Sequence, residues 1–264
     1  MLNISKWLIK YKNREIPPGF YEQPIGANTA ERILQLCGIK NNYNVSDVKI
    51  FDFGCGSGRY MKIFAMNVPK KNIIGADINW SSLSQAHKCG FNCVLLSIAD
   101  SILPFDNECF DVVFSSNVIE HIPRDLYLKY LEEIHRVLKP GGIFVVGAPN
   151  YPVKRLYDIR AAIKTIKYRK YYLFDDPTHC NKLSILQVER DLERLFEGIF
   201  LEPSWIPFES KISLLRNQTV RHRMRLFGYK FSGRCKKPMR INQNNIGVTT
   251  IENSHLNKDF KIFE

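Results

Sequence analysis

The chain has 264 residues, of which 45% are apolar, and this length and composition suit one globular α/β domain with insertions. It carries 38 Lys and Arg against 26 Asp and Glu, and no stretch reaches the roughly 18 apolar residues that a membrane-spanning helix needs. Seven scattered cysteines without metal-type spacing argue against a disulfide framework and a zinc site, so we expect reduced thiols, no metal and a cytoplasmic protein.

Residues 1–44 precede the first predicted strand and are interpreted as an N-terminal cap segment. Trp7, Leu8 and Tyr11 form an apolar face among lysines. This pattern fits a basic amphipathic helix at a membrane surface, and it equally fits a cap helix folded over a cofactor pocket. A second helix, packed on the sheet, is predicted over residues 30–37.

Residues 48–58 read Val-Lys-Ile-Phe-Asp-Phe-Gly-Cys-Gly-Ser-Gly, an apolar run that predicts a buried strand and ends in three alternating glycines. The glycines free the backbone to turn sharply beneath a ligand. The third glycine comes one residue too early for a dinucleotide fingerprint, and Arg59-Tyr60 stands where a phosphate-binding P-loop has Lys-Ser/Thr. The loop is therefore nucleotide-type but matches neither template.

A second apolar strand over residues 72–76 leads into Asp77, where a carboxylate of an α/β fold can accept hydrogen bonds from both ribose hydroxyls. Together with Asp52-x-Gly54-x-Gly56-x-Gly58, this pattern resembles the class I S-adenosylmethionine (SAM) dependent methyltransferases. Further strands at residues 94–96, 110–116 and 143–146 and an amphipathic helix closed by Lys-Pro-Gly-Gly follow in the family's order. The resemblance implies a Rossmann-like sheet of seven strands with helices on both faces. A Rossmann-like protein that binds another nucleotide is the alternative.

The resemblance implies SAM as the cofactor and assigns its contacts residue by residue. Backbone at Gly54 to Gly56 would approach the amino-acid part of SAM, Asp77 the ribose and Asp100 the adenine edge, while Ile78 and Ala99 would sandwich the adenine. Asp100 could instead be a surface turn carboxylate. The implied cofactor-binding residues are Asp52, Gly54, Cys55, Gly56, Gly58, Asp77, Ile78, Ala99, Asp100 and Asn117.

The segment Asn117-Val118-Ile119-Glu120-His121 carries the candidate catalytic residues. It resembles the E-x-x-E-H stretch of ubiquinone-pathway and small-RNA 2'-O-methyltransferases, where both Glu and the His can bind a divalent ion. Asn117 replaces the first Glu, so we predict no metal. Glu120 and His121 are then candidates for a general base because His titrates near neutral pH, or they merely cap and pack the adjoining helix. His179, in a D-P-x-H element, is a second candidate base or an ordinary loop histidine.

The basic excess lies in the second half, where residues 151–264 carry 22 Lys and Arg against 12 Asp and Glu. Residues 153–181 are predicted to be a basic helical insertion after strand five, followed by a helix from residue 185 and a sixth strand at 199–207. Residues 210–251 lack any acid, and 245–251 are expected to form the seventh, antiparallel strand. The methyltransferase domain would span 45–251, with 153–181 and 210–240 as basic acceptor-side or lid segments, and 252–264 a polar tail.

Motifs that the chain lacks narrow the range of possible methyl acceptors. The chain has neither the N/D-P-P-Y/F turn of amino-methylating nucleic-acid enzymes nor the Pro-Cys of cytosine methylation after strand four, so oxygen methylation is favoured. The motif set resembles O-methyltransferases of cell-surface polysaccharide and quinone pathways, and this resemblance implies a small, glycan-like or lipid-linked acceptor. The basic half suits an anionic acceptor and peripheral contact with a membrane surface, and no obligate protein partner is expected. An RNA methyltransferase and a non-catalytic SAM-binding subunit are the open alternatives.

Overall fold

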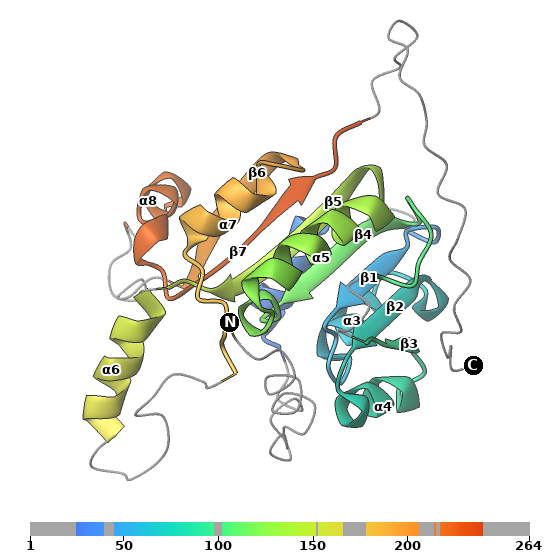
Figure 1. Cartoon of the computed structure of the whole chain (residues 1–264), viewed down its shortest axis with the longest axis horizontal. Helices are drawn as coiled ribbons and strands as arrows, with labels where there is room; N and C mark the ends of the chain where they lie inside the picture. The colour runs from blue at the N-terminus through green and yellow to red at the C-terminus, as the bar shows by residue number, and fades with distance from the viewer. Residues whose placement is uncertain are drawn as a thin grey trace, which may run out of the picture.

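The computed structural model describes residues 25–39, 45–97, 102–151, 153–165, 178–205, 214 and 217–239. Within them, seven strands form one sheet in the order β3-β2-β1-β4-β5-β7-β6 (Figure 1). The strands are β1 Ile50–Phe53, β2 Ile73–Asp77, β3 Asn92–Leu95, β4 Phe110–Ser116, β5 Leu138–Pro149, β6 Glu197–Trp205 and β7 Lys230–Lys236. The first five are parallel, and β7 runs antiparallel between β5 and β6.

Helices cover both faces of this sheet. The α-helices are α2 Ala27–Leu36, α3 Arg59–Phe64, α4 Trp80–Lys88, α5 Arg124–Val137, α6 Val153–Thr165, α7 Ile185–Leu192 and α8 Gln218–Arg223. The short 3-10 helices are η1 Lys70–Asn72, η3 Ile119–His121 and η6 Arg225–Phe227. Figure 1 shows α5 and α7 side by side on one face, whereas α6 projects away from the sheet.

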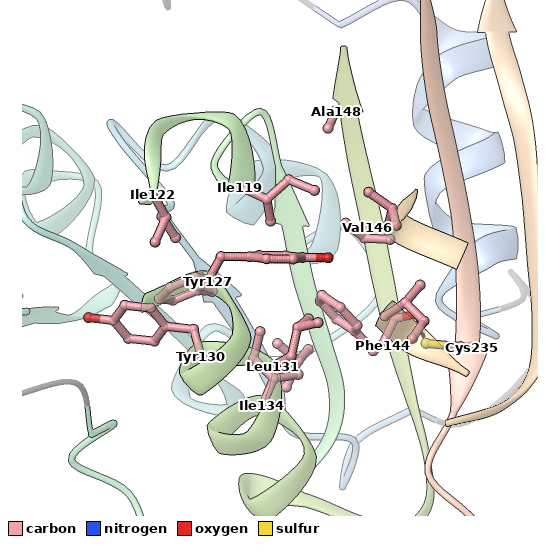
Figure 2. Packing of buried hydrophobic residues seen from close by; sticks show 14 of the residues in the cluster. Ile119, Ile122, Tyr127, Tyr130, Leu131, Ile134, Phe144, Val146, Ala148 and Cys235 are labelled. Carbon is pink, nitrogen blue, oxygen red and sulfur yellow. Dashed lines mark hydrogen bonds between the residues drawn. The ribbon is translucent and has the colours of Figure 1, made fainter. Parts of the chain in front are cut away.

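Two apolar clusters fill the spaces between the sheet and its helices. One lies under α5 and α7, where Tyr127, Leu131 and Ile134 pack beside Phe144 and Val146 of β5 (Figure 2). The other lies under α2, α3 and α4 on the opposite face. Because β1 is covered on both sides, all four of its residues are buried, which explains why it is apolar apart from Asp52.

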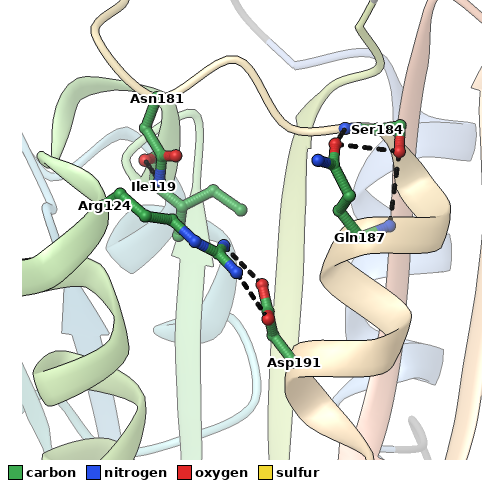
Figure 3. Close-up of polar contacts among 6 residues, drawn as sticks. All are labelled: Ile119, Arg124, Asn181, Ser184, Gln187 and Asp191. Atoms are coloured by element: carbon green, nitrogen blue, oxygen red, sulfur yellow. Dashed lines mark hydrogen bonds and ion pairs between the residues drawn. The ribbon is translucent and has the colours of Figure 1, made fainter.

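An ion pair fixes α7 against α5 and thereby positions the chain segment that enters α7. Arg124 donates to both carboxylate oxygens of Asp191, at 2.5 and 2.7 Å (Figure 3). Helix α7 begins in a capping box, in which the Ser184 hydroxyl accepts from the Gln187 amide and the Gln187 side chain accepts from the Ser184 amide. Residues 178–184 are therefore anchored at their C-terminal end.

The predicted seven-stranded sheet is confirmed, but the identity of its antiparallel strand was predicted wrongly. Lys230–Lys236 forms that strand, and residues 245–251 lie outside the described residues. Phe231, Gly233 and Cys235 are buried in alternation with less buried neighbours. This period of two was hidden inside a run rich in Lys and Arg, which suggested a surface segment.

The remaining expectations divide between the described and the undescribed chain. Helix α6 lies within the stretch 153–181 that was expected to be an insertion. Residues 1–24, with the expected amphipathic helix around Trp7, Leu8 and Tyr11, and the 252–264 tail lie outside the described residues. In the part of the chain that the structure describes, no helix is long and apolar enough to cross a membrane.

Candidate functional site

The glycine loop lies where β1 passes into α3, at the carboxyl edge of the parallel strands, the edge at which such sheets bind ligands. Gly54, Gly56 and Gly58 all have positive φ, at 79°, 54° and 77°, so their backbone adopts a conformation that other residues rarely take. A Cβ on Gly54 would also collide with the side chain of Val118. The loop therefore needs glycine at 54 both for its conformation and for its contact with the segment after β4.

Asp77 ties the glycine loop to the end of β2. Its Oδ2 accepts from the amide of Gly56 at 2.9 Å and its Oδ1 accepts from the amide of Asn79 at 2.8 Å. Burial raises the pKa of the Asp77 carboxyl, and these backbone N–H groups partly oppose that rise. Each carboxylate oxygen has a second lone pair, so Asp77 can hold the loop and still accept from ribose hydroxyls.

Asp52 lies beneath the loop with only 1% of its surface exposed. Its Oδ2 has no hydrogen-bond partner among the described residues. Burial and then the neighbouring Asp77 raise the pKa of this carboxyl well above its usual range. A buried carboxylate oxygen of this kind calls for a donor. An ammonium group would satisfy it, and SAM carries one on its amino-acid part, so the loop fits the expected cofactor.

The other expected cofactor residues divide into three groups. Cys55 is buried and its sulfur packs against Gly75, so only its backbone can face a ligand, whereas Ile78 is partly buried beside the core. Ala99 and Asp100 lie outside the described residues, so their adenine contacts stay predictions. Asn117 follows β4 with a φ of +57°, and its amide donates to Gly147 on β5 at 2.8 Å.

Glu120, His121 and His179 come together from two distant parts of the chain. Glu120 and His121 are 2% and 7% exposed on η3, and His179 lies on the segment that enters α7. One potential ligand atom from each of the three side chains lies within 4.8 Å of the other two. The two imidazole rings are 4.7 Å apart between centroids and meet edge to face. We call these three residues the base cluster.

Hydrogen bonds orient the two imidazoles of the base cluster. The Thr178 hydroxyl lies 2.9 Å from His121 Nδ1, and the Tyr151 hydroxyl lies 2.6 Å from His179 Nδ1. Asn181 joins the two chain segments, because its amide donates to the Glu120 carbonyl at 3.0 Å and its side chain to Ile119 at 3.2 Å (Figure 3). With Nδ1 engaged, each ring is held in a defined orientation, as acid–base catalysis requires.

The base cluster also has the chemistry of a cation site. One carboxylate and two imidazoles match the ligands of zinc and similar divalent ions. The predicted absence of a metal therefore stays a prediction. An opposing feature is Lys230, whose ammonium interacts with the Glu120 carboxylate and so competes for the charge that would attract an ion.

Lys230 is a residue of the site that sequence reasoning missed. It enters from β7, and its Nζ donates to Asn117 Oδ1 at 3.2 Å. Burial lowers the pKa of its ammonium group, and the nearby cations Lys154 and Arg59 lower it further, against the opposite effect of Glu120. The charges of Arg59 on α3 and Lys154 on α6 thus act on Lys230 of β7, although Lys154 also pairs with Asp158 at 2.5 Å. The signal of Lys230 in the sequence is weak: it begins the stretch Lys230–Lys236, in which apolar or small residues alternate with polar ones.

The chain is similar in sequence to known methyltransferases. Residues 51–146 match a protein family described as "Methyltransferase domain". A malonyl-[acyl-carrier protein] O-methyltransferase from Legionella pneumophila is 32% identical over 53% of this chain and 47% of its own length. The sterol 4-C-methyltransferase strm-1 from Caenorhabditis elegans is 26% identical over 82% of this chain and 60% of its own length. This chain therefore spans less than two thirds of either relative.

A solved structure shares the fold over nearly its whole length. A SAM-dependent methyltransferase from Archaeoglobus fulgidus superposes with a TM-score of 0.58 at 17% identity, covering 88% of this chain and 99% of that one. This likeness concerns the fold alone.

Proposed function

The chain carries a class I SAM-dependent methyltransferase domain, and we propose that the protein methylates an oxygen atom of a small, glycan-like or lipid-linked anionic acceptor. SAM, when bound, supplies a methyl group that its sulfonium makes electrophilic, and it leaves as S-adenosylhomocysteine. The protein's own task is to hold the acceptor in line and to take its proton.

The observation that carries this proposal is the contact between the cofactor loop and the segment that bears Glu120 and His121. Val118 packs directly against Gly54, so the loop and the start of η3 are neighbours. Glu120 and His121 of the base cluster follow Val118 within three residues. An acceptor hydroxyl beside the loop would have His121 or His179 within reach as the base, with Glu120 stabilising the imidazolium that forms.

An anionic acceptor is supported by the cations around the site. Lys230 is close enough to Lys154 and Arg59 for their charges to lower the pKa of its ammonium. Burying cations near one another is unfavourable unless anions compensate them. Asp158 pairs with Lys154 at 2.5 Å and Glu120 attracts Lys230, whereas Arg59 forms no ion pair with any residue that the structure describes. An acceptor with a carboxylate or phosphate would add negative charge beside these cations, whereas a neutral acceptor would not.

A lipid-linked acceptor and peripheral membrane contact are supported by the surface of α6. Leu156 and Ile159 are 67% and 47% exposed, on a helix that projects from the sheet (Figure 1). Spaced by three residues, they lie on the same side of the helix and are flanked by Arg155. A cytoplasmic protein of this kind would touch an anionic membrane surface through α6.

RNA methylation is less well supported, because several cations of the acid-free stretch have internal partners. Arg225 pairs with Glu189 at 2.6 Å, and Lys237 donates to the Leu138 carbonyl at 2.8 Å. Lys230 lies in the site itself. These three side chains are not available to follow a phosphate backbone.

The test is the release of S-adenosylhomocysteine in the presence of a panel of acceptors: sugar phosphates, polyprenyl phosphates, phenolic acids and RNA. We expect release with a phosphorylated or carboxylated acceptor, and a large loss of rate in His121→Ala with SAM affinity nearly kept. If the protein bound SAM but released no S-adenosylhomocysteine with any acceptor of the panel, the non-catalytic SAM-binding subunit would be favoured. Turnover on RNA alone would favour the RNA methyltransferase.

A further inference from the structure

A hollow of about 390 Å³ lies outside the base cluster, lined by Tyr151, Arg155, Lys182, Ser184 and Gln187. We propose that this hollow, called here the outer pocket, binds a phosphate group of the acceptor while the acceptor oxygen lies at the base cluster. The proposal rests on the proposed function, because it names the chemical group that the same enzyme would recognise. Most of the residues that line the outer pocket come from the start of α6 and from the segment that enters α7.

The charge of the outer pocket is entirely positive. Arg155 and Lys182 line it, and none of its five lining residues is acidic. Arg155 forms no ion pair with any residue that the structure describes, so its charge is not already compensated there. A guanidinium offers a planar pair of donors that matches two phosphate oxygens, and an ammonium adds a second charge for a dianion.

The polar side of the pocket is held rigidly by the capping box of α7. The Ser184 amide and hydroxyl both donate to Gln187 Oε1, at 2.8 and 3.1 Å. Figure 3 shows the Gln187 side chain with its oxygen toward Ser184 and its amide nitrogen on the far side. The capping box therefore fixes the Gln187 amide, which can act as a donor at the pocket without losing the bonds that begin the helix.

Tyr151 is the wall that the outer pocket shares with the base cluster. Its hydroxyl contacts His179 Nδ1 at 2.6 Å. Its ring lies 5.6 Å from Lys154 Nζ and 5.8 Å from Lys182 Nζ. A ligand in the pocket would thus be one side chain away from the base cluster. The volume falls in the range of pockets that hold small organic molecules, so there is room for a sugar or similar group besides its phosphate.

The experiment is a calorimetric titration with pyrophosphate, a probe that needs no knowledge of the acceptor. Three forms are compared: the wild type, the double variant Arg155→Gln with Lys182→Gln, and the control Lys88→Gln. Lys88 is an exposed lysine of α4, and Figure 1 shows α4 and α6 at opposite sides of the molecule. We expect the double variant to bind pyrophosphate at least about tenfold more weakly than wild type and Lys88→Gln to match it. Equal affinity in all three forms, or an equal loss in the control, would overturn the proposal.

A SAM titration of the same samples separates the two claims. Unchanged SAM affinity in the double variant shows that it is folded, and Arg155→Lys, which keeps the charge but loses the planar donors, should give an intermediate pyrophosphate affinity. If the wild type bound pyrophosphate through Arg155 and Lys182 but did not bind SAM, the proposed function would fail and the anion site would stand.

The source of the phosphate is distinguished by sedimentation with phosphatidylcholine vesicles that contain phosphatidic acid. Vesicle binding that is lost in the double variant assigns the pocket to a lipid phosphate headgroup. Pyrophosphate binding without vesicle binding assigns it to a soluble phosphate ester. Vesicle binding unaffected by the double variant, together with unaffected pyrophosphate binding, would contradict both assignments.

Discussion

The Tyr151 hydroxyl lies 2.6 Å from His179 Nδ1, and this contact joins the end of β5 to the segment that enters α7. It holds the His179 ring beside His121, at a centroid distance of 4.7 Å. The two candidate bases are 58 positions apart in the sequence, and Tyr151 helps to keep the ring of His179 next to that of His121. The first prediction follows from this relationship.

Tyr151→Phe should lower kcat about tenfold while SAM affinity stays at the wild-type value, because the ring remains but no longer orients His179. The rate of S-adenosylhomocysteine release and a calorimetric SAM titration measure the two quantities. His179→Ala should be at least as impaired. If the Tyr151→Phe enzyme kept the full wild-type rate, the orientation of His179 by Tyr151 would have no part in catalysis.

Gly54→Ala should destroy SAM binding and lower the free energy of unfolding, for two separable reasons. The positive φ costs about 1–2 kcal/mol for any residue with a Cβ, and the new methyl group meets Val118. Adding Val118→Ala should relieve the collision but not the backbone strain, and so restore stability in part. Urea unfolding of the two variants checks this, and a Gly54→Ala protein as stable as wild type would contradict the loop geometry.

Asp52→Asn should stabilise the protein without cofactor near neutral pH, by about 1–3 kcal/mol, while it weakens SAM binding. Burial raises the pKa of Asp52, so its contribution to stability is complete below its unfolded pKa of about 4 and is lost as pH rises toward the folded pKa. The wild type should therefore lose stability above pH 4 more steeply than the variant. The urea midpoints of the wild type and of Asp52→Asn are measured across this pH range. If Asp52 did not titrate in this way, the two sets of midpoints would change with pH in parallel.

Treatment with EDTA should leave methyl transfer unchanged and release no stoichiometric metal, because we assign the base cluster to proton transfer and Lys230 lies beside Glu120. Metal analysis of the purified protein and activity after dialysis measure this. Activity that disappears with EDTA and returns with a divalent ion would make Glu120, His121 and His179 ligands, and the acid–base assignment would be replaced.

The parts of the site that depend on neighbouring residues could be predicted from the sequence. The glycine loop, the carboxylate at Asp77 and the boundaries of β4 all follow from short patterns, since their conformation is set by local steric rules and by burial on both faces. The prediction that His121 and His179 belong to one site required the family resemblance, because no local pattern relates two positions so far apart.

The parts that depend on long-range packing could not be predicted. Lys230 looked like one cation among many in a basic run, and only the pairing of β7 with β5 brings it to Asn117. Likewise, the sequence did not show that Tyr151 contacts His179, because that contact depends on how residues 178–184 pack beside the end of β5. The charge of residues 210–240 could be read from composition, but its division between ion pairs and the site could not.

The most direct test of the central claim is a pair of calorimetric titrations of the purified protein, one with SAM and one with NADH, repeated on Asp77→Ala and on the exposed control Asp47→Ala. We predict that the wild type and the control bind SAM and not NADH, and that Asp77→Ala binds SAM at least about tenfold more weakly, because it loses the ribose acceptor and the bond to the Gly56 amide. Absence of SAM binding, or preferential binding of NADH, would contradict the account.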